Sequence, residues 1–311
     1  MPAITLSKSG LLTTVQDLGR FGFGRFGVPR SGAMDTLALR MANRLVGNSD
    51  SLSALEITAV GPEIVFHQET CFALAGGNLT PALDHQPLQT WESYAAKPGA
   101  ILRFGPRRQG ARCYLAVPGG FIVPPVMGSA STDLDSGLGG IDGKPLRAGQ
   151  TLEIAGGFRE VGHRVRLELL QQYASPFELR FVREEDQCLD EATLKTFQAS
   201  CYRISQQSNR MGYRLRGPRI SSDVTADMIS DAIPPGTIQA PPGGEPILLM
   251  AEGQCVGGGG YPRLGYVIRA DLPKAAQLWP GHSICFREVS LDEASILFQK
   301  QELLLEGSIR R

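Results

Sequence analysis

The 311-residue sequence lacks any apolar run near the roughly 20 residues that a membrane-spanning helix requires. It also lacks net charge, since Lys+Arg and Asp+Glu both number 31, and no overall field attracts nucleic acid or anionic membranes. The first ten residues, MPAITLSKSG, lack the charged and apolar regions of a signal peptide. We therefore expect a cytoplasmic protein with neither a membrane nor a nucleic-acid partner.

Cysteine is sparse, and the sequence contains no C-x-x-C pair. Without a secretory context, free thiols are expected at the six positions 71, 113, 188, 201, 255 and 285. The four histidines share no ligand spacing. We therefore expect no metal site.

Glycine and proline are abundant, with 37 and 21 residues, which is typical of short strands joined by tight turns. Helical patterns are few, and we expect them near 190–200, 272–279 and 291–306, the last capped by Ser290. Apolar or alternating runs predict strands at 63–67, 71–76, 100–104, 112–117, 151–155, 164–170, 177–182, 237–240, 247–252, 266–270 and 284–289. The chain is thus predicted to be mostly β with few helices. A weak boundary divides it into 1–160 and 161–311.

The segment 13–56 combines a polar loop with the clearest helix of the N-terminal half. The loop is too polar for the core, and Ser31 is expected to cap a helix that ends at Gly47. Arg20 is shaped to hold a carboxylate or phosphate, and backbone N–H groups at Ser31 and Gly32 could bind the same anion. Asp35 could instead be a charge of the first helical turn. Asp17 and Arg20 could equally stabilise a turn, with Gln16 beside them.

Residues 22–27 spell GFGRFG, which fits the dinucleotide pattern G-x-G-x-x-G. That motif needs a strand before it and a helix opening within it, but here the helix begins only after Pro29. A loop anchored by Phe21, Phe23 and Phe26 is the preferred interpretation.

Two further polar blocks interrupt strand-like sequence. The first contains Ser129, Ser131, Thr132 and Asp133 beside two glycines, and fits either a ligand-binding loop or a turn. The second, 206–213, combines amides and a guanidinium that suit a planar amide or carboxylate substrate. Considered alone, this second block could also be a solvated turn.

The stretches TTVQDLGR, SGAMD, RMANRLVGN, GGFIVPPVMGSASTDL and QSNRMGYRLRG resemble the family of biotin-dependent carboxyltransferases and allophanate hydrolase subunit 2. The resemblance covers nearly the whole chain and implies two cyclophilin-like β-barrel halves. It implies catalytic roles for Asp17, Arg20, Asn209 and Arg210. The implied substrate-binding residues are Gln16, Ser31, Gly32, Asp35, Ser131, Thr132, Gln206, Gln239 and Tyr261.

The sequence departs from this family at two places. Relatives have an acidic residue, a Thr-Thr pair and Gly-Gly-Tyr-Pro, whereas this chain has Cys255 and Val256 where the hydroxyls are expected. It also reads VREED at 182–186, where relatives have Pro-Gly-Pro. Cys255 has no neighbouring histidine in the sequence to activate it as a nucleophile.

Three functions are consistent with the resemblance. The first is a subunit of an ATP-dependent 5-oxoprolinase, with a Kip-inhibitor-like (allophanate hydrolase subunit 1-like) subunit and a lactam-utilisation subunit as partners. The second is carboxyl transfer from biotin on a separate carrier to a urea-like amide. The third is a regulatory protein that antagonises a Kip-type kinase inhibitor. A chain that ends near residue 311 with no fused carrier favours the first, and no Walker motif marks an ATP site.

The polar blocks at 13–35, 129–133 and 206–213 lie far apart in the sequence. Polar, glycine-rich loops on a β scaffold are frequent sites of function, and clefts between halves often bind ligands. We therefore expect Arg20, Thr132 and Asn209 to face one common cleft.

Overall fold

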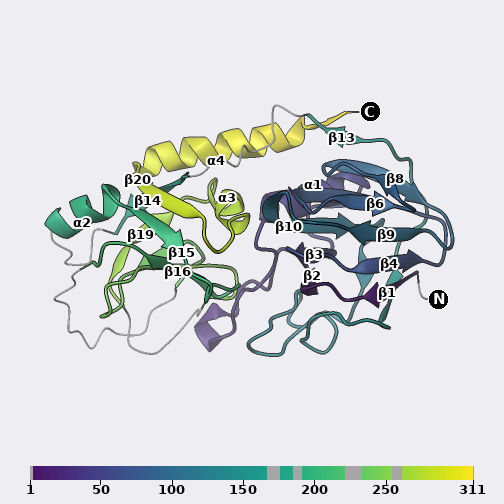
Figure 1. The fold of residues 1–311 in the computed structure, drawn as a ribbon, viewed down its shortest axis with the longest axis horizontal. Helices are drawn as coiled ribbons and strands as arrows, with labels where there is room; N and C mark the ends of the chain where they lie inside the picture. Colours follow the sequence, from purple (N-terminus) through teal and green to yellow (C-terminus); the bar gives the residue numbers. More distant parts are fainter. Residues whose placement is uncertain (1–2, 167–175, 185–190, 221–232, 254–260, 311) are drawn as a thin grey trace. The chain divides into compact units, whose positions relative to one another are not determined.

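The computed structural model describes residues 3–166, 176–184, 191–220, 233–253 and 261–310 (Figure 1). Strands dominate these residues, which also contain four α-helices and one short 3-10 helix. The prediction of a mostly β chain with few helices is confirmed. No helix in these ranges is long and apolar enough to cross a membrane.

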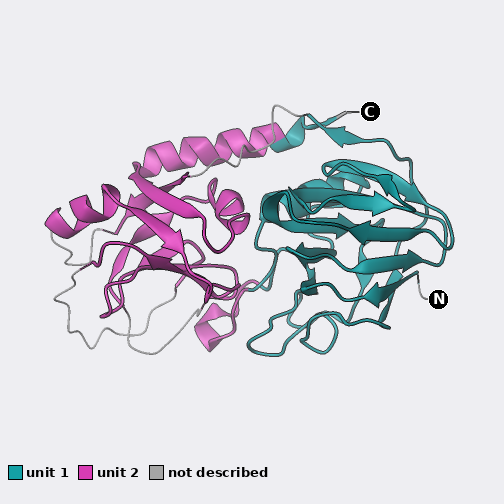
Figure 2. Ribbon diagram, in the orientation of Figure 1, with its two compact units in different colours: residues 1–20, 31–171, 305–311 teal, residues 21–30, 172–304 magenta. Residues whose placement is uncertain are grey.

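The chain forms two compact units, coloured separately in Figure 2. Unit 1 comprises residues 1–20, 31–171 and 305–311, and unit 2 comprises 21–30 and 172–304. The units are interleaved in sequence, because 21–30 belongs to unit 2 while its flanks belong to unit 1. The predicted division into an N-terminal β half, 1–160, and a C-terminal β half, 161–311, stays a prediction.

Unit 1 contains two seven-stranded sheets. The first has the order β11-β12-β1-β4-β9-β6-β7, with β1 Ile4–Lys8, β4 Glu63–Phe66, β6 Pro81–Leu83, β7 Gln86–Pro87, β9 Ile101–Phe104, β11 Phe121–Ile122 and β12 Thr151–Ile154. The second has the order β2-β3-β10-β5-β8-β13-β21, with β2 Leu12–Gln16, β3 Ala54–Thr58, β5 Thr70–Asn78, β8 Glu92–Ala96, β10 Gln109–Ala116, β13 Arg164–Val165 and β21 Ile309–Arg310. The expected run at 164–170 is a strand at 164–165, and its residues from 167 lie outside the described ranges.

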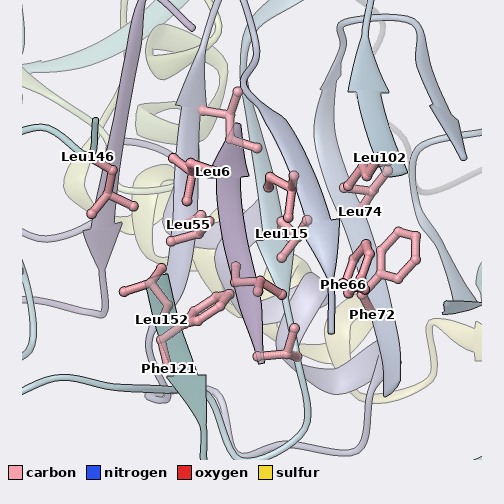
Figure 3. Packing of buried hydrophobic residues seen from close by; sticks show 14 of the residues in the cluster. Leu6, Leu55, Phe66, Phe72, Leu74, Leu102, Leu115, Phe121, Leu146 and Leu152 are labelled. Carbon is pink, nitrogen blue, oxygen red and sulfur yellow. The ribbon is translucent and has the colours of Figure 1, made fainter. Parts of the chain in front are cut away.

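Alternate side chains of the two sheets enclose one apolar core (Figure 3). Leu6 and Phe66 come from the first sheet, and Leu55, Phe72 and Leu115 come from the second. The rings of Phe66 and Phe72 stack with centroids 5.2 Å apart. Burying such side chains contributes about 1.5–3 kcal/mol each, so this core supplies the main driving force for folding unit 1.

The opposite face of the second sheet carries small residues and is covered by α1 (Thr36–Leu45). Ala73, Ala75 and Ala116 let the helix approach closely, which explains why β5 and β10 are buried on both faces. Asp35, not Ser31, is the N-cap, with its carboxylate accepting the Ala38 N–H at 2.8 Å. The predicted cap at Ser31 is therefore wrong.

The first residues of the segment 13–56 also do not form the predicted loop. Residues Leu12–Gln16 form the buried strand β2, paired with β3. Threonine and valine favour strands, and the threonine hydroxyls find partners. Thr13 Oγ1 donates to the Ser9 carbonyl at 3.1 Å, and Thr14 Oγ1 accepts Gln16 Nε2 at 3.0 Å. Satisfied hydrogen bonds make these polar residues compatible with the core.

Unit 2 contains a closed barrel with the order β14-β19-β17-β18-β16-β15-β20. Its strands are β14 Phe177–Arg183, β15 Cys201–Ile204, β16 Gly212–Arg216, β17 Thr237–Gln239, β18 Ile247–Leu249, β19 Arg263–Val267 and β20 Ser283–Glu288. Phe181, Phe197, Tyr202 and Phe286 form an aromatic cluster, with Phe197 and Phe286 stacked at 4.7 Å. The closed barrel confirms a barrel in the C-terminal half.

The three later helices confirm the sequence predictions. They are α2 (Glu191–Gln198), α3 (Leu272–Ala276) and α4 (Leu291–Glu306). Leu194 and Phe197 of α2 point inward, as expected from their spacing. Ser290 caps α4, its hydroxyl accepting the Glu293 N–H at 3.1 Å.

Two of the three aromatic rings expected to anchor the GFGRFG loop are exposed, and Phe23 is half-buried. Phe21 and Phe26 are 61% and 65% exposed, and the loop includes only the 3-10 helix η1 (Gly24–Phe26). The Arg30 guanidinium lies 4.0 Å from the Phe21 ring centroid, so a surface cation–π pair covers one ring in place of a core. β2 ends well before the loop and α1 begins well after it, which removes the context of a dinucleotide fingerprint.

The prediction of six free thiols is wrong for two of them. Cys201 and Cys285 form a disulfide, whereas Cys71 and Cys113 are free and buried. The bridged residues are direct partners of the antiparallel strands β15 and β20, with Cα atoms 4.3 Å apart. Cys188 and Cys255 lie outside the described residues.

The disulfide should stabilise the barrel. Because it joins positions 84 residues apart, Cys201→Ser should lower the free energy of unfolding of the oxidised protein by about 2–4 kcal/mol. Urea unfolding measures the change, and thiol counting verifies the oxidation state. With excess reductant the variant and the parent should unfold alike; equal stability under oxidising conditions would contradict the bridge.

Candidate functional site

The Asp17 carboxylate joins two loops of unit 1. Oδ1 accepts hydrogen bonds from Gly19 N–H and Ser129 Oγ, both at 2.7 Å, and from Ser131 Oγ at 2.5 Å. Oδ2 accepts the Ala130 N–H at 2.7 Å. Hydrogen bonds to an ionised acceptor are stronger than neutral ones, so this carboxylate holds the segment after β2 against the second glycine-rich loop.

Three more side chains of the first block donate to consecutive carbonyls of the second. Arg20 Nη2 donates to the Ser131 carbonyl at 2.5 Å. The Thr132 carbonyl accepts both Ser31 Oγ, at 2.8 Å, and Gln16 Nε2, at 3.0 Å. Blocks 13–35 and 129–133 therefore form one buried polar cluster, and the catalytic or substrate-binding roles expected for its members stay predictions.

Two glycines permit the close approach of these loops. A Cβ at Gly139 would lie 2.1 Å from the Ser131 carbonyl oxygen and 2.7 Å from Arg20 Nη2. A Cβ at Gly32 would lie 2.8 Å from the Gly19 nitrogen, and Gly32 also has a φ of +91°. Ser31 itself has a φ of 54°, an uncommon conformation for a residue with a side chain. Such backbone is kept only where the surroundings enforce it.

Two buried acceptors in the cluster have no hydrogen-bond donor among the described residues. They are Gln16 Oε1 and Asp133 Oδ2. The other oxygen of Asp133 accepts backbone N–H groups of Asp135 and Ser136, at 3.2 and 2.9 Å. Buried polar atoms usually have partners, so these two oxygens could accept N–H or O–H groups from outside the chain.

The structure shows a structural role for Asp35 at the start of α1. Its carboxylate caps α1, and its backbone N–H donates to the Tyr114 hydroxyl at 2.8 Å. The carboxylate and the backbone N–H of Asp35 therefore both have partners within the chain, as expected for a residue at the start of a helix. A ligand role for Asp35 stays a prediction without direct support.

The third block lies in unit 2, in the turn between β15 and β16. Asn209 is exposed, and its Oδ1 accepts the N–H groups of Met211 and Gly212 at 2.9 and 3.3 Å. Arg210 is instead buried, and its Nε donates to Glu252 Oε1 at 2.6 Å, with both side chains 3% exposed. The block is thus a turn with three exposed amides, those of Gln206, Gln207 and Asn209, and one buried charge. A buried ion pair fixes geometry, since removing either partner leaves an uncompensated charge.

The remaining predicted residues of unit 2 have different surroundings. Gln206 is exposed in the same turn, and Tyr261 is 40% exposed. Gln239 is buried on β17, paired with Ile247 of β18. Cys255 and Val256 lie outside the described residues.

Two buried glutamates, one in each unit, were not predicted from the sequence. Glu252 immediately precedes Gly253 and is buried against Arg210, a contact that the local sequence pattern did not indicate. Glu56 lies on β3 and is buried beneath the start of α1. A single carboxylate within the strand ALEIT gives no signal from periodicity alone.

The first two polar blocks belong to unit 1 and the third to unit 2. The expectation that Arg20, Thr132 and Asn209 face a single cleft joins both units and stays a prediction.

Comparison with protein families gives a match over most of the chain. The family described as "Carboxyltransferase domain, subdomain A and B" matches residues 26–288. The chain belongs to this family. Its polar clusters are therefore those of a carboxyltransferase-family protein, which confirms the resemblance noted in the sequence.

Individual relatives agree with this assignment. The chain is 38% identical to the C subunit of 5-oxoprolinase from Haemophilus influenzae, over 96% of this chain and 94% of that protein. It is likewise 38% identical to the corresponding 5-oxoprolinase protein of Escherichia coli, over 97% of this chain and 96% of that protein. The crystal structure of the Kluyveromyces lactis urea carboxylase is similar with a TM-score of 0.91 and 30% identity. That match covers 98% of this chain but only 29% of the urea carboxylase chain.

Asp17 should be essential for stability. Asp17→Asn replaces an acceptor of four side-chain and backbone donors by an amide, and should lower the free energy of unfolding by at least about 2 kcal/mol. Chemical denaturation measures this loss. Asp142→Asn, in the same long loop, is the control and should have little effect. Unchanged stability of Asp17→Asn would argue against its structural role.

Arg20 is predicted from sequence to bind an anion, so that Arg20→Ala would weaken substrate use without changing the melting temperature. Its side chain is 2% exposed and bonded to Ser131, so we now expect a loss of about 1.5–3 kcal/mol of stability as well. Thermal unfolding tests this, with Arg25→Ala, an exposed arginine of the neighbouring loop, as the matched control. An unchanged melting temperature with impaired substrate use would restore the sequence-based expectation.

Proposed function

We propose that this chain is the C subunit of an ATP-dependent 5-oxoprolinase, which opens the lactam ring of 5-oxoproline to L-glutamate. The extent of similarity supports this proposal. Identity of 38% extends over nearly the full length of two proteins that carry this name. The match to the urea carboxylase, in contrast, involves less than a third of that chain. Similarity over whole chains favours an equivalent role in an assembly.

The proposed enzyme requires partners. We assign to it a Kip-inhibitor-like (allophanate hydrolase subunit 1-like) subunit and a lactam-utilisation subunit, all in the cytoplasm. ATP is consumed by the complex. The sequence of this chain contains no Walker motif, so we place no nucleotide site on it.

Burial divides the candidate residues into two proposed roles. Gln16, Asp17, Arg20, Ser131 and Thr132 are buried and bonded within unit 1, so they form the framework of the site. The exposed side chains, which can reach a small molecule, are those of Gln206, Asn209 and Tyr261.

Amide groups match the chemistry of the proposed substrate. The exposed carboxamide of Gln206 can accept the lactam N–H and donate to the lactam or carboxylate oxygen. Asn209, whose Oδ1 already accepts two backbone N–H groups, can donate to such an oxygen through Nδ2. Activation of the lactam oxygen by phosphate develops negative charge, which guanidinium and backbone N–H donors stabilise. Arg210 lies in the same turn but is buried and paired with Glu252, so we assign it to holding this turn in place.

The second candidate function is carboxyl transfer to a urea-like amide. The TM-score of 0.91 with the urea carboxylase structure favours it. The sequence contains no Met-Lys biotin attachment segment, so carboxybiotin would have to arrive on a separate carrier protein. A purely regulatory role would require binding to the Kip-inhibitor-like subunit without catalysis.

The purified chain alone should show only background conversion of 5-oxoproline to glutamate, because the reaction needs the other subunits. Adding the two proposed partners with ATP should produce glutamate and ADP together. Glutamate is measured enzymatically and ADP by a coupled assay. Robust turnover by the isolated chain would contradict the requirement for partners.

The same reconstitution separates the three functions. Conversion of 5-oxoproline by the complete complex supports the proposal. Carboxylation of urea with a carboxylated biotin carrier, and no lactam opening, supports the alternative. Stable binding of the Kip-inhibitor-like subunit with neither reaction supports the regulatory role.

A further inference from the structure

A carboxylate and a phenol are buried together on the face of the second sheet that α1 covers. Glu56 of β3 and Tyr114 of β10 are direct cross-strand partners, and both are buried. The Tyr114 hydroxyl donates to Glu56 Oε2 at 2.6 Å. Many of the residues packed on this face are alanines.

The pair holds the backbone just before α1. Glu56 Oε2 also accepts the Met34 N–H at 2.9 Å, and the Tyr114 oxygen accepts the Asp35 N–H at 2.8 Å. N–H groups at the beginning of a helix have no partner within the helix, and these two side chains supply partners from the sheet. The pair therefore fixes where the chain enters α1.

This contact continues directly into the candidate site. The Ala33 N–H donates to the Asp17 carbonyl at 2.9 Å, and Ser31 Oγ donates to the Thr132 carbonyl at 2.8 Å. The segment 31–35 is thus held on one side by the polar cluster around Asp17. On the other side it is held by Glu56 and Tyr114.

The cost of burying a carboxylate indicates that the pair has a specific task. An ionised group in the interior loses several kcal/mol of hydration, which an apolar side chain of similar size would avoid. Arg112, whose Nε lies 3.7 Å from Glu56 Oε1, offsets part of this cost. Burial, together with the charge of Glu56, raises the pKa of Tyr114 well above its ordinary value. The phenol therefore stays protonated and can donate to Glu56.

We propose that Glu56 and Tyr114 are positioning residues that set the conformation of segment 31–35, and through it the placement of Ser31 and Gly32 in the site. The effect on catalysis rests on the proposed 5-oxoprolinase function. The effect on the segment itself does not. Two separate measurements can therefore test the two parts.

The first measurement is amide hydrogen exchange of the full chain. Tyr114→Phe removes the acceptor of the Asp35 N–H and should accelerate exchange at residues 33–36 by about five- to tenfold, relative to the remainder of β3 and β10. Glu56→Ala should do the same, whereas Glu56→Gln retains an acceptor and should restore most of the protection. Unchanged exchange in both Tyr114→Phe and Glu56→Ala would overturn the proposal.

Thr58→Val is the matched control. Thr58 lies two residues from Glu56 on the same face of β3, and its buried hydroxyl has no partner among the described residues. This variant should leave exchange at 33–36 unchanged. Accelerated exchange in Thr58→Val as well would mean that any change on this face loosens the segment, and would overturn a specific role for the pair.

The second measurement is the kinetics of the reconstituted complex. Tyr114→Phe and Glu56→Ala should raise KM for 5-oxoproline by about fivefold or more, which corresponds to the free energy of one lost hydrogen bond. The effect on kcat should be smaller, and Glu56→Gln should lower KM most of the way back to the parent value. Faster exchange with unchanged KM would show that the segment does not serve the site. If the parent complex does not open 5-oxoproline, the proposed function fails, while hydrogen exchange still decides the positioning role.

Discussion

The polar cluster of unit 1 depends on the buried carboxylate of Asp17. It accepts hydrogen bonds from two serine hydroxyls and two backbone N–H groups, contributed by the segment after β2 and by the second glycine-rich loop. A buried charge is tolerated only when it is surrounded by donors in good geometry. The two loops must therefore adopt one arrangement to satisfy it, and that arrangement brings Arg20 to the Ser131 carbonyl.

A second constraint acts on the same segment from the sheet. β5 and β10 are buried on both faces, with large side chains toward the other sheet and alanines toward α1. The closely packed helix can shift little, and the buried Glu56–Tyr114 pair fixes its first residues. The site is thus built on rigid strands and one helix rather than on a free loop, which is the arrangement that precise positioning of a small molecule requires.

The two units place their polar residues differently. In unit 1 the residues singled out by sequence are buried and bonded to each other, so they act as a framework. In unit 2 the turn after β15 exposes the amide of Asn209 while Glu252 holds Arg210 in the interior. The predicted site residues of this chain are therefore of two kinds, buried ones bonded to each other within unit 1 and exposed ones in unit 2.

The sequence by itself determined the class of fold, about half of the strands, α2 to α4 with the Ser290 cap, and the family. These depend on local periodicity, capping chemistry and contiguous motifs. Only the tertiary structure decided that Leu12–Gln16 is a buried strand, that Asp35 replaces Ser31 as the cap, and that Cys201 bonds Cys285. It alone joined Glu56 to Tyr114 and Arg210 to Glu252. Each of these features depends on strand register or on a partner distant in the sequence. A local sequence pattern contains no information about register or distant partners.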